Sequence, residues 1–298
     1  MLEQTELGRT GLRVTRLGFG AMELRGPRVW NGRPVSDEEA ERMLNAVLDS
    51  GINFIDTSYD YGRSEDLIGR FVSHRRHEFV LATKCGCTLV DRGDHDETPH
   101  VWTRENLLHN VDTSLRRMKT DYIDLLQLHG PTVRQVEEGR LIDALQEIQA
   151  AGKVRFIGIS SYLPQLPGHM EYGEYDAFQI PYSALEREHE QLIREAGESG
   201  RGVIVRGGVG QGEPGKGRGS VDRWAAWERA RLDELRAEGE SPTGFLLRFA
   251  LSHPQLSTTI VGTSNPAHLK ENARMAEKGA LPPDVYEEAR RRLDAAGE

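Results

Sequence analysis

The chain alternates short apolar strand patterns with amphipathic helix patterns almost from end to end, and this alternation constrains the fold. Helices are expected after Ser36, an N-cap with Glu39 three residues later, and also over about 138–151 and 222–238. The strands are expected at 17–21, 52–55, 79–83, 123–128, 154–159, 177–180, 203–205 and 259–261. These strands are too apolar for one-sided exposure. Eight strand-then-helix units over about 250 residues therefore predict an α/β fold, a closed (β/α)8 TIM barrel.

Two short strands near 5–7 and 12–15, separated by Gly-Arg-Thr-Gly, predict an N-terminal β-hairpin before the barrel, and the second half adds extra helices. We expect one domain over 1–298. The net charge of −9 disfavours nucleic acid and anionic membranes as partners. The start of the chain lacks a signal-peptide pattern and no long apolar run follows, which predicts a soluble cytoplasmic protein. Cys85 and Cys87 are spaced too closely for a good disulfide and offer only two soft ligands, so we expect reduced thiols and no metal site.

Polar residues stand where three of the expected strands end. Asp56 follows the second strand, Lys84 the third and His129 the fourth, while Tyr61 lies on the loop after Asp56. Such residues are often structural when taken singly. However, barrel enzymes carry their active sites at the C-terminal ends of the strands, so all four should converge on one mouth. The set therefore predicts a catalytic site.

The most specific stretches are GINFIDTSYDYGRSEDLIGRF (51–71), LATKCG (81–86) and SLRRMKTDYIDLLQLH (114–129). GKVRFIGISSY, FQIPYS and IVGTSNPAHLKEN support them. On these motifs the chain resembles the aldo-keto reductase superfamily over essentially its whole length. The resemblance implies a barrel that binds NADP(H) and reduces a small aldehyde or ketone without a metal, with Asp56, Tyr61, Lys84 and His129 as the catalytic tetrad.

The chemistry of the tetrad follows from its residue types. Hydride delivery to a carbonyl creates a strongly basic alkoxide, which a phenol with a pKa of about 10 protonates downhill, so Tyr61 is the expected general acid. Lys84 beside it should favour phenolate and lower the pKa of Tyr61, while Asp56 keeps Lys84 charged and in place. Neutral His129 is expected to donate a hydrogen bond to the carbonyl oxygen.

The resemblance also assigns cofactor contacts. Ser160, Ser161 and Gln179 match positions that hold the nicotinamide carboxamide, with Ser161 in place of the usual Asn. Arg206 stands where the family often has a stacking Tyr, and the sequence leaves open whether it stacks or reaches a phosphate. The expected set is Gly20, Ala21, Asp56, Ser160, Ser161, Gln179, Arg206, Gly207, Gly208, Gly262, Thr263, Ser264, His268, Glu271 and Asn272.

The adenosine end of the cofactor decides between NADP(H) and NAD(H). Members committed to NADPH often carry Lys or Arg where this chain has Gly262 and His268. Hydroxyls of Thr263 and Ser264 at a helix N-terminus nevertheless suit a phosphate. NADP(H) is favoured, and NAD(H) stays an alternative.

Residues 207–219 (GGVGQGEPGKGRG) contain a GxGxxG pattern and an imitation of a Walker A loop. Pro214 and the lack of a strand-helix context argue against the first, and Gly217 in place of Ser or Thr argues against the second. Two interpretations stay open: a flexible surface loop, or a segment that folds over the cofactor pyrophosphate with Lys216 or Arg218 meeting its charge.

Met22, Trp30 and the loop 86–102 follow the first three strands and are expected around the substrate pocket, although Trp30 and Trp102 can equally be packing residues. Two other functions remain. One is a cofactor-binding regulatory module comparable to the potassium-channel β subunits. The other is an aldolase with Lys84 as a Schiff-base nucleophile, which requires a depressed lysine pKa that a paired Asp56 would prevent.

Overall fold

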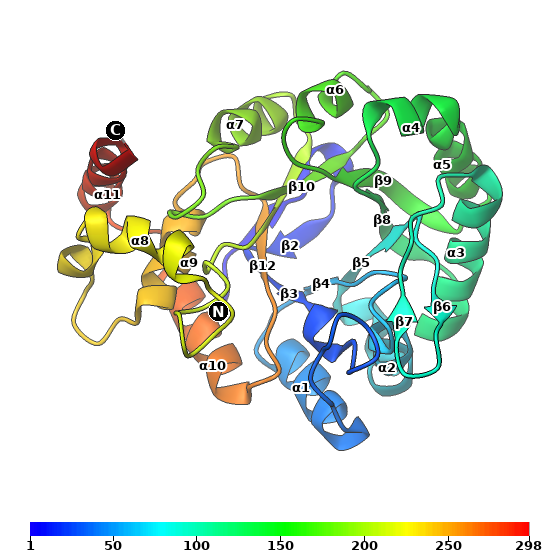
Figure 1. Ribbon diagram of the computed structural model, residues 1–298, viewed down its shortest axis with the longest axis horizontal. Coiled ribbons are helices and arrows are strands. Elements are labelled where there is room, and N and C mark those ends of the chain that lie inside the picture. Colours follow the sequence, from blue (N-terminus) through cyan, green and yellow to red (C-terminus); the bar gives the residue numbers. More distant parts are fainter. Residues whose placement is uncertain (298) are drawn as a thin grey trace.

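The computed structural model describes residues 1–297, so the last residue of the expected 1–298 domain lies outside the described residues. Parallel strands close into an eight-stranded barrel with helices around its outside (Figure 1), which confirms the predicted (β/α)8 architecture. The barrel strands are β3 (Leu17–Gly20), β4 (Phe54–Asp56), β5 (Val80–Cys85), β8 (Ile123–His129), β9 (Val154–Ser160), β10 (Ala177–Pro181), β11 (Gly202–Arg206) and β12 (Thr258–Val261).

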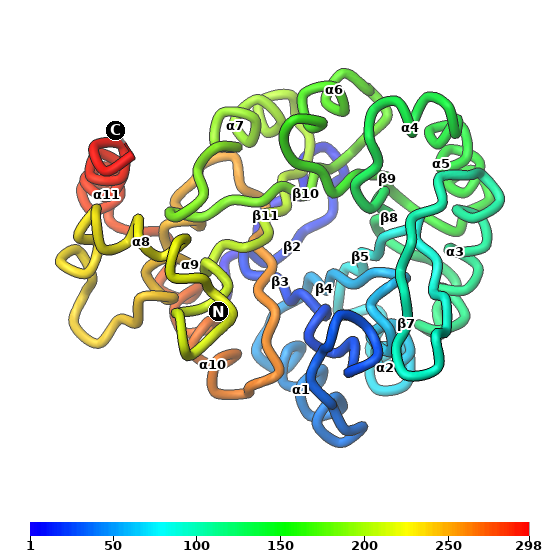
Figure 2. The backbone as a smooth tube through the Cα atoms, in the orientation of Figure 1, coloured from blue at the N-terminus to red at the C-terminus, as the bar shows by residue number. Residues whose placement is uncertain are grey.

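The strands follow one another around the barrel in chain order, and the last one closes it. β12 pairs with β3, where Ile260 lies opposite Gly18. In Figure 2 the orange trace of β12 accordingly runs beside the blue trace of β3. Because every strand of the barrel is parallel to its neighbours, all eight C-terminal ends open onto the same face.

Apolar faces of the helices pack on the outer faces of these strands, for example Met43, Leu44 and Val47 of the first helix. The helices are α1 (Asp37–Asp49), α2 (Ser64–Phe71), α3 (Arg104–Met118), α4 (Val133–Glu138), α5 (Leu141–Ala150), α6 (Leu166–Met170), α7 (Glu190–Glu198), α8 (Val221–Arg229), α9 (Pro242–Leu251), α10 (Pro266–Lys278) and α11 (Pro283–Gly297). Short 3-10 helices are η1 (Gly8–Thr10), η2 (Ala21–Leu24), η3 (Ser73–Glu78) and η4 (Leu232–Leu235).

The predicted start of α1 is confirmed, because Ser36 and Glu39 form a reciprocal capping box. Two other helix predictions were wrong in extent. The helix expected over about 138–151 begins at Leu141, since Arg140 adopts a left-handed backbone (φ 49°) that separates α4 from α5. The helix expected over about 222–238 ends at Arg229, because Arg231 is also left-handed (φ 51°).

The predicted N-terminal hairpin forms from β1 (Gln4–Glu6) and β2 (Arg13–Thr15), which pair antiparallel. Leu7, Leu12 and Val14 pack against the first residues of barrel strands, such as Phe54 and Val80. The hairpin therefore covers the end of the barrel at which the strands begin and does not cover the end at which they finish. A second small hairpin, β6 (Val90–Asp91) with β7 (Asp96–Glu97), lies within the loop 86–102 and was not predicted. Among residues 1–297, no helix is both long enough and apolar enough to cross a bilayer.

Candidate active site

A buried ion pair joins the ends of two neighbouring barrel strands. Asp56 ends β4, and its Oδ2 accepts a hydrogen bond from the Nζ of Lys84 on β5 at 2.6 Å. Lys84 Nζ also donates to the carbonyl oxygen of Thr57 at 2.8 Å. Burial by itself lowers the pKa of Lys84, but the charge and hydrogen bond of Asp56, together with Tyr61 and Asp60, outweigh it, and the pKa lies above its ordinary value. Lys84 is therefore a fixed cation.

The second oxygen of Asp56 is also occupied. Oδ1 accepts hydrogen bonds from Gln127 Nε2 at 3.0 Å and from Gln179 Nε2 at 2.8 Å, and the hydroxyl of Ser160 donates to Gln179 Oε1 at 3.2 Å. These bonds hold the carboxylate rigidly across the barrel. Sequence reasoning missed Gln127, although it lies two residues before His129 and therefore on the same face of β8.

Tyr61 lies over this pair. Lys84 Nζ is 5.0 Å from the centre of the phenol ring, and Trp30 and His129 approach the ring edge-on at centroid distances of 5.8 and 6.0 Å. Burial raises the pKa of Tyr61, and the opposing effect of Lys84 is smaller, so the net direction is upward. Lys84 acts on this pKa in the expected downward direction, but burial, which the expectation left out, outweighs it.

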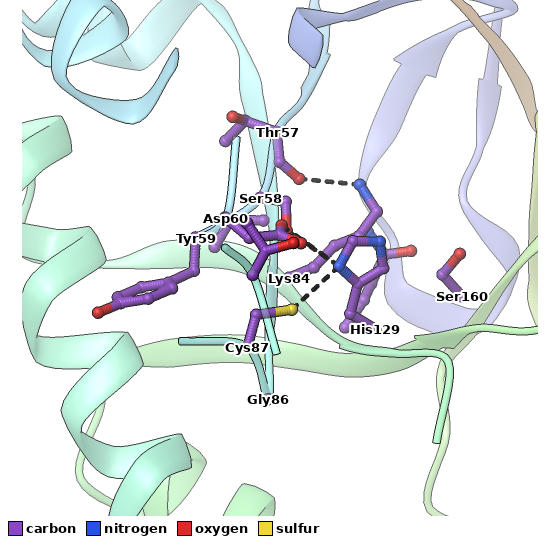
Figure 3. A network of polar contacts seen from close by, with 12 residues as sticks. Thr57, Ser58, Tyr59, Asp60, Lys84, Gly86, Cys87, His129 and Ser160 are labelled. Carbon is purple, nitrogen blue, oxygen red and sulfur yellow. Dashed lines mark hydrogen bonds and ion pairs between the residues drawn. The ribbon is translucent and has the colours of Figure 1, made fainter. Parts of the chain in front are cut away.

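Three polar groups surround Nδ1 of His129, which ends β8 (Figure 3). The Oγ of Ser58, the Sγ of Cys87 and the Oδ1 of Asp60 each lie 3.3 Å from it. Burial acts to raise the pKa of Asp60, but His129, Ser58 and Cys87 outweigh it and hold that pKa well below the usual range. Cys87 was expected only to be a reduced thiol, and Asp60 was not among the predicted site residues. Both lie against His129, and no spacing signal in the sequence indicates this contact.

The residues that the resemblance assigns to the cofactor gather at the same end of the barrel, at or just beyond the ends of β3 and β9–β12. The backbone of Gly20 approaches Gly262 so closely that a side chain at Gly262 would collide with the Gly20 carbonyl oxygen. Thr263 Oγ1 accepts from the amide of Asn265 at 3.0 Å. The remaining members lie at Ala21 in η2, Ser160, Ser161, Gln179, Arg206, Gly207 and Gly208 along the rim, and Ser264, His268, Glu271 and Asn272 near or within α10.

A cation that sequence reasoning missed lies beside this segment. Arg33 Nε donates a hydrogen bond to Ser264 Oγ at 2.6 Å, from a loop that precedes α1. Its guanidinium is also 3.7 Å from the carboxylate of Glu39. Arg33 thus brings a guanidinium to the segment 262–268, which contains Gly262 and exposed His268 but neither Lys nor Arg.

Residues 207–219, which follow β11, reach past β12 to the segment that follows β3. Arg218 forms an ion pair with Glu23 of η2, and Lys216 pairs within the loop with Glu213 at 3.1 Å. Arg206, which precedes this loop, lies 6.0 Å from the ring centre of exposed Tyr162. Arg206, whose role the sequence leaves open between stacking and phosphate binding, therefore has an aromatic neighbour of its own.

The predicted pocket residues Met22 and Trp30 lie at the mouth. Met22 is half-buried on η2, while Trp30 is 48% exposed and donates from Nε1 to Thr98 Oγ1 at 3.1 Å. Trp30 therefore contacts both the loop 86–102, through its hydrogen bond to Thr98, and the ring of Tyr61. Trp102 instead stacks on His100 with an interplanar angle of 16°.

A family model described as the aldo/keto reductase family matches residues 16–293. The chain belongs to the aldo/keto reductase family. Its members are oxidoreductases that bind a nicotinamide cofactor, and the family match agrees with the resemblance inferred from the sequence motifs.

Several bacterial oxidoreductases are similar to most of this chain. An uncharacterised oxidoreductase of Bacillus subtilis is 28% identical over 299 residues, covering 94% of this chain and 93% of the relative. An NADH-specific methylglyoxal reductase of Escherichia coli is 28% identical over 227 residues, covering 71% and 68%. The solved holo form of a Bacillus halodurans aldo-keto reductase is 27% identical with a TM-score of 0.83, covering 99% and 96%.

Proposed function

We propose that the protein reduces small aldehydes or ketones to alcohols with NADP(H), and that Tyr61 donates the proton. The observation that carries this proposal is the phenol of Tyr61 placed over the buried Asp56–Lys84 pair, with His129 on its other side. When bound, the reduced nicotinamide supplies the hydride to the carbonyl carbon.

Tyr61 has the protonation state that reduction needs. Its pKa lies above the ordinary value of about 10, so the phenol keeps its proton throughout the physiological range. The developing alkoxide is far more basic than a phenolate, so proton transfer runs downhill. Lys84 then stabilises the phenolate left behind, because the Asp56 carboxylate keeps the ammonium charged.

His129 orients the carbonyl oxygen. Its Nδ1 faces Asp60, Ser58 and Cys87, and no group within residues 1–297 forms a hydrogen bond with its Nε2. Nε2 is the nitrogen left to contact substrate. In the neutral tautomer with its ring proton on Nε2, Nδ1 would accept from the Cys87 thiol, and a hydrogen bond donated from Nε2 would stabilise negative charge on the substrate oxygen as the hydride arrives.

The rim offers donors suited to each part of the cofactor. Ser160, Ser161 and Gln179 would hold the nicotinamide carboxamide with hydroxyl and amide groups. Arg206 and Arg218 would face the pyrophosphate, and Arg33 beside Ser264 would face the 2′-phosphate that distinguishes NADP(H) from NAD(H). One Escherichia coli relative is named as NADH-specific, so the preference of this protein for NADP(H) over NAD(H) needs a direct binding measurement.

The Schiff-base alternative is disfavoured by the same ion pair. A nucleophilic lysine must lose its proton near neutral pH, whereas the pKa of Lys84 lies above its ordinary value because Asp56, with Tyr61 and Asp60, outweighs the effect of burial. The other alternative is a regulatory module comparable to channel β subunits, which would bind the same cofactor but turn over little substrate. A measurement of carbonyl turnover therefore distinguishes it from the reductase.

The deciding experiment compares Tyr61→Phe with Tyr59→Phe, a buried tyrosine two positions earlier that packs on the guanidinium of Arg117. NADPH oxidation is followed with a panel of aldehydes and ketones. We expect Tyr61→Phe to lower kcat at least about 100-fold, the lower end of the effect of general acid catalysis, while Tyr59→Phe stays within a few-fold of wild type.

NADPH binding is measured on both variants to show that the site is intact. Near-normal turnover by Tyr61→Phe would rule out this proton donor. If the wild-type protein binds NADPH tightly but turns over none of the carbonyl panel, the regulatory module replaces the reductase.

A further inference from the structure

Four side chains with metal-ligand chemistry come together around Nδ1 of His129: Asp60, Cys87, His100 and His129 itself. One donor atom from each lies within 4.8 Å of every other. Two imidazoles, a thiol and a carboxylate form a donor set that zinc takes. In Figure 3 the Cys87 sulfur and the Asp60 carboxylate lie on the same side of the His129 ring.

The distances between donors already approach those of a tetrahedral site. Zinc bonds of about 2.0–2.3 Å place neighbouring ligand atoms roughly 3.3–3.8 Å apart. From Nδ1 of His129, the Sγ of Cys87 and the Oδ1 of Asp60 are each 3.3 Å away. Because no pair in the cluster exceeds 4.8 Å, side-chain shifts of roughly 1–1.5 Å would complete the coordination.

The backbone holds Cys87 and His100 opposite one another. They form an antiparallel bridge, flanked by hydrogen bonds from Thr88 N to the Pro99 oxygen and from Val101 N to the Gly86 oxygen, both 2.8 Å. Cross-strand partners in such a bridge point to the same side. Two of the four donors are therefore placed by main-chain pairing and not by flexible side chains alone.

Asp60 gives an independent sign of a missing ligand. The residue is 0% exposed, and its Oδ2 has no hydrogen-bond partner within residues 1–297. Buried carboxylate oxygens are normally paired, since an unpaired one loses its hydration without compensation. A cation bound by the Asp60 carboxylate would offset that loss. His100 is exposed, so the cluster opens to solvent through it.

We propose that Asp60, Cys87, His100 and His129 bind a Zn²⁺ ion. On binding, the Cys87 thiol releases its proton to solvent and coordinates as thiolate, while Asp60 coordinates as the carboxylate it already is. Coordination through Nδ1 leaves the remaining ring proton of His129 on Nε2. This tautomer donates a hydrogen bond toward the substrate side. The expectation of no metal considered only the two cysteines, whereas three of these donors come from other residue types.

The test measures binding and needs no turnover, so it stands apart from the proposed reductase function. The full chain, without any affinity tag and freed of metal by chelator dialysis, is titrated with Zn²⁺ in competition with a chromophoric chelator. We expect one ion per chain. Co²⁺ in place of Zn²⁺ should show the near-ultraviolet charge-transfer band of a thiolate ligand.

Matched variants identify the ligands. Cys87→Ala and His100→Ala should each weaken Zn²⁺ binding by at least about 100-fold, beyond the range caused by losing a second-shell group. Cys85→Ala removes the other buried thiol, and His95→Ala removes an exposed histidine of the same loop. Neither control should change the affinity.

Because His100 is exposed, His100→Ala should keep the fold, which circular dichroism verifies. The site is overturned if the wild-type protein cannot compete for Zn²⁺, if the Co²⁺ complex lacks the thiolate band, or if Cys85→Ala weakens binding as much as Cys87→Ala.

Discussion

Arg33 supplies a guanidinium to Ser264 from a position 231 residues earlier in the chain. Near Ser264 in the sequence, positions 262 and 268 hold Gly and His, where NADPH-committed relatives often have Lys or Arg. The predicted preference for NADP(H) therefore rested on the hydroxyls of Thr263 and Ser264 alone. A loop before α1 has no pattern that indicates which part of the barrel rim it will contact. The four tetrad residues were predictable because each belongs to a strand end or the turn after it, whereas Arg33, Asp60 and Cys87 acquire their neighbours only through folding.

Arg33→Ala should therefore shift cofactor preference. A hydrogen bond to a charged group contributes about 1.5–3 kcal/mol, so loss of one to a 2′-phosphate should raise the Kd for NADPH about 10-fold or more. NADH has no such phosphate, and its Kd should change little. Both constants are measured by quenching of intrinsic fluorescence.

The control for this prediction is Arg13→Ala, which removes an exposed arginine from the hairpin at the opposite end of the barrel. It should leave both constants unchanged. Equal weakening of NADPH and NADH by Arg33→Ala would show that Arg33 does not recognise the 2′-phosphate.

Among the elements, the loop 207–219 has the least regular sequence and the clearest functional proposal. Its glycines gave two interpretations that sequence could not separate, because backbone freedom serves a mobile loop and a phosphate-binding loop alike. The ion pair of Arg218 with Glu23 links the loop to η2, which follows β3, two strands further around the barrel from β11. This contact favours the second interpretation, a segment that folds over the cofactor pyrophosphate.

Limited trypsin digestion tests this proposal. Cleavage after Lys216 and Arg218 should slow on adding NADPH, because a loop that contacts the pyrophosphate spends less time open to the protease. Cleavage after exposed Arg92, in the loop 86–102, is an internal control and should keep its rate. If all three sites respond equally, NADPH stabilises the whole molecule and the loop has no special role.

At the scale of the whole molecule, barrel closure explains why so much was predictable. Strand polarity alone sends Asp56, Lys84 and His129 to one mouth once the chain is known to form a closed parallel barrel. Side-chain networks inside that mouth follow different rules. Gln127 and Gln179 both donate to Asp56, although strands β8 and β10 are not neighbours in the barrel, so no local pattern links them. Net pKa directions likewise depend on burial, which only the folded chain defines.

The stability of the whole barrel should fall in mild acid because of His253, which is 1% exposed. Its Nδ1 accepts a hydrogen bond from the amide of Gln255 at 3.2 Å, while its Nε2 is buried and has no partner within residues 1–297. Burial lowers the pKa of His253 to about 4, with nearby Glu190 acting in the opposite direction and Arg194 in the same one. Protonation would put a donor on the nitrogen that now accepts, and would bury a charge.

Since the folded pKa lies below the unfolded value of about 6.5, the unfolded chain takes up the proton first as pH falls. The contribution of His253 to stability is thus complete above pH 6.5 and is lost between about pH 6.5 and 4, by roughly 3 kcal/mol in all. Urea unfolding is measured at several pH values between about 6.5 and 4. Over this range, the free energy of unfolding should fall by roughly 3 kcal/mol less in His253→Gln than in the wild type.

Exposed His77→Gln is the control and should retain the wild-type pH dependence. Carboxylates that titrate in the same range are shared by all three proteins, so their contribution cancels in the comparison. A His253→Gln profile parallel to wild type would mean that His253 is already protonated, or hydrated, in the folded protein.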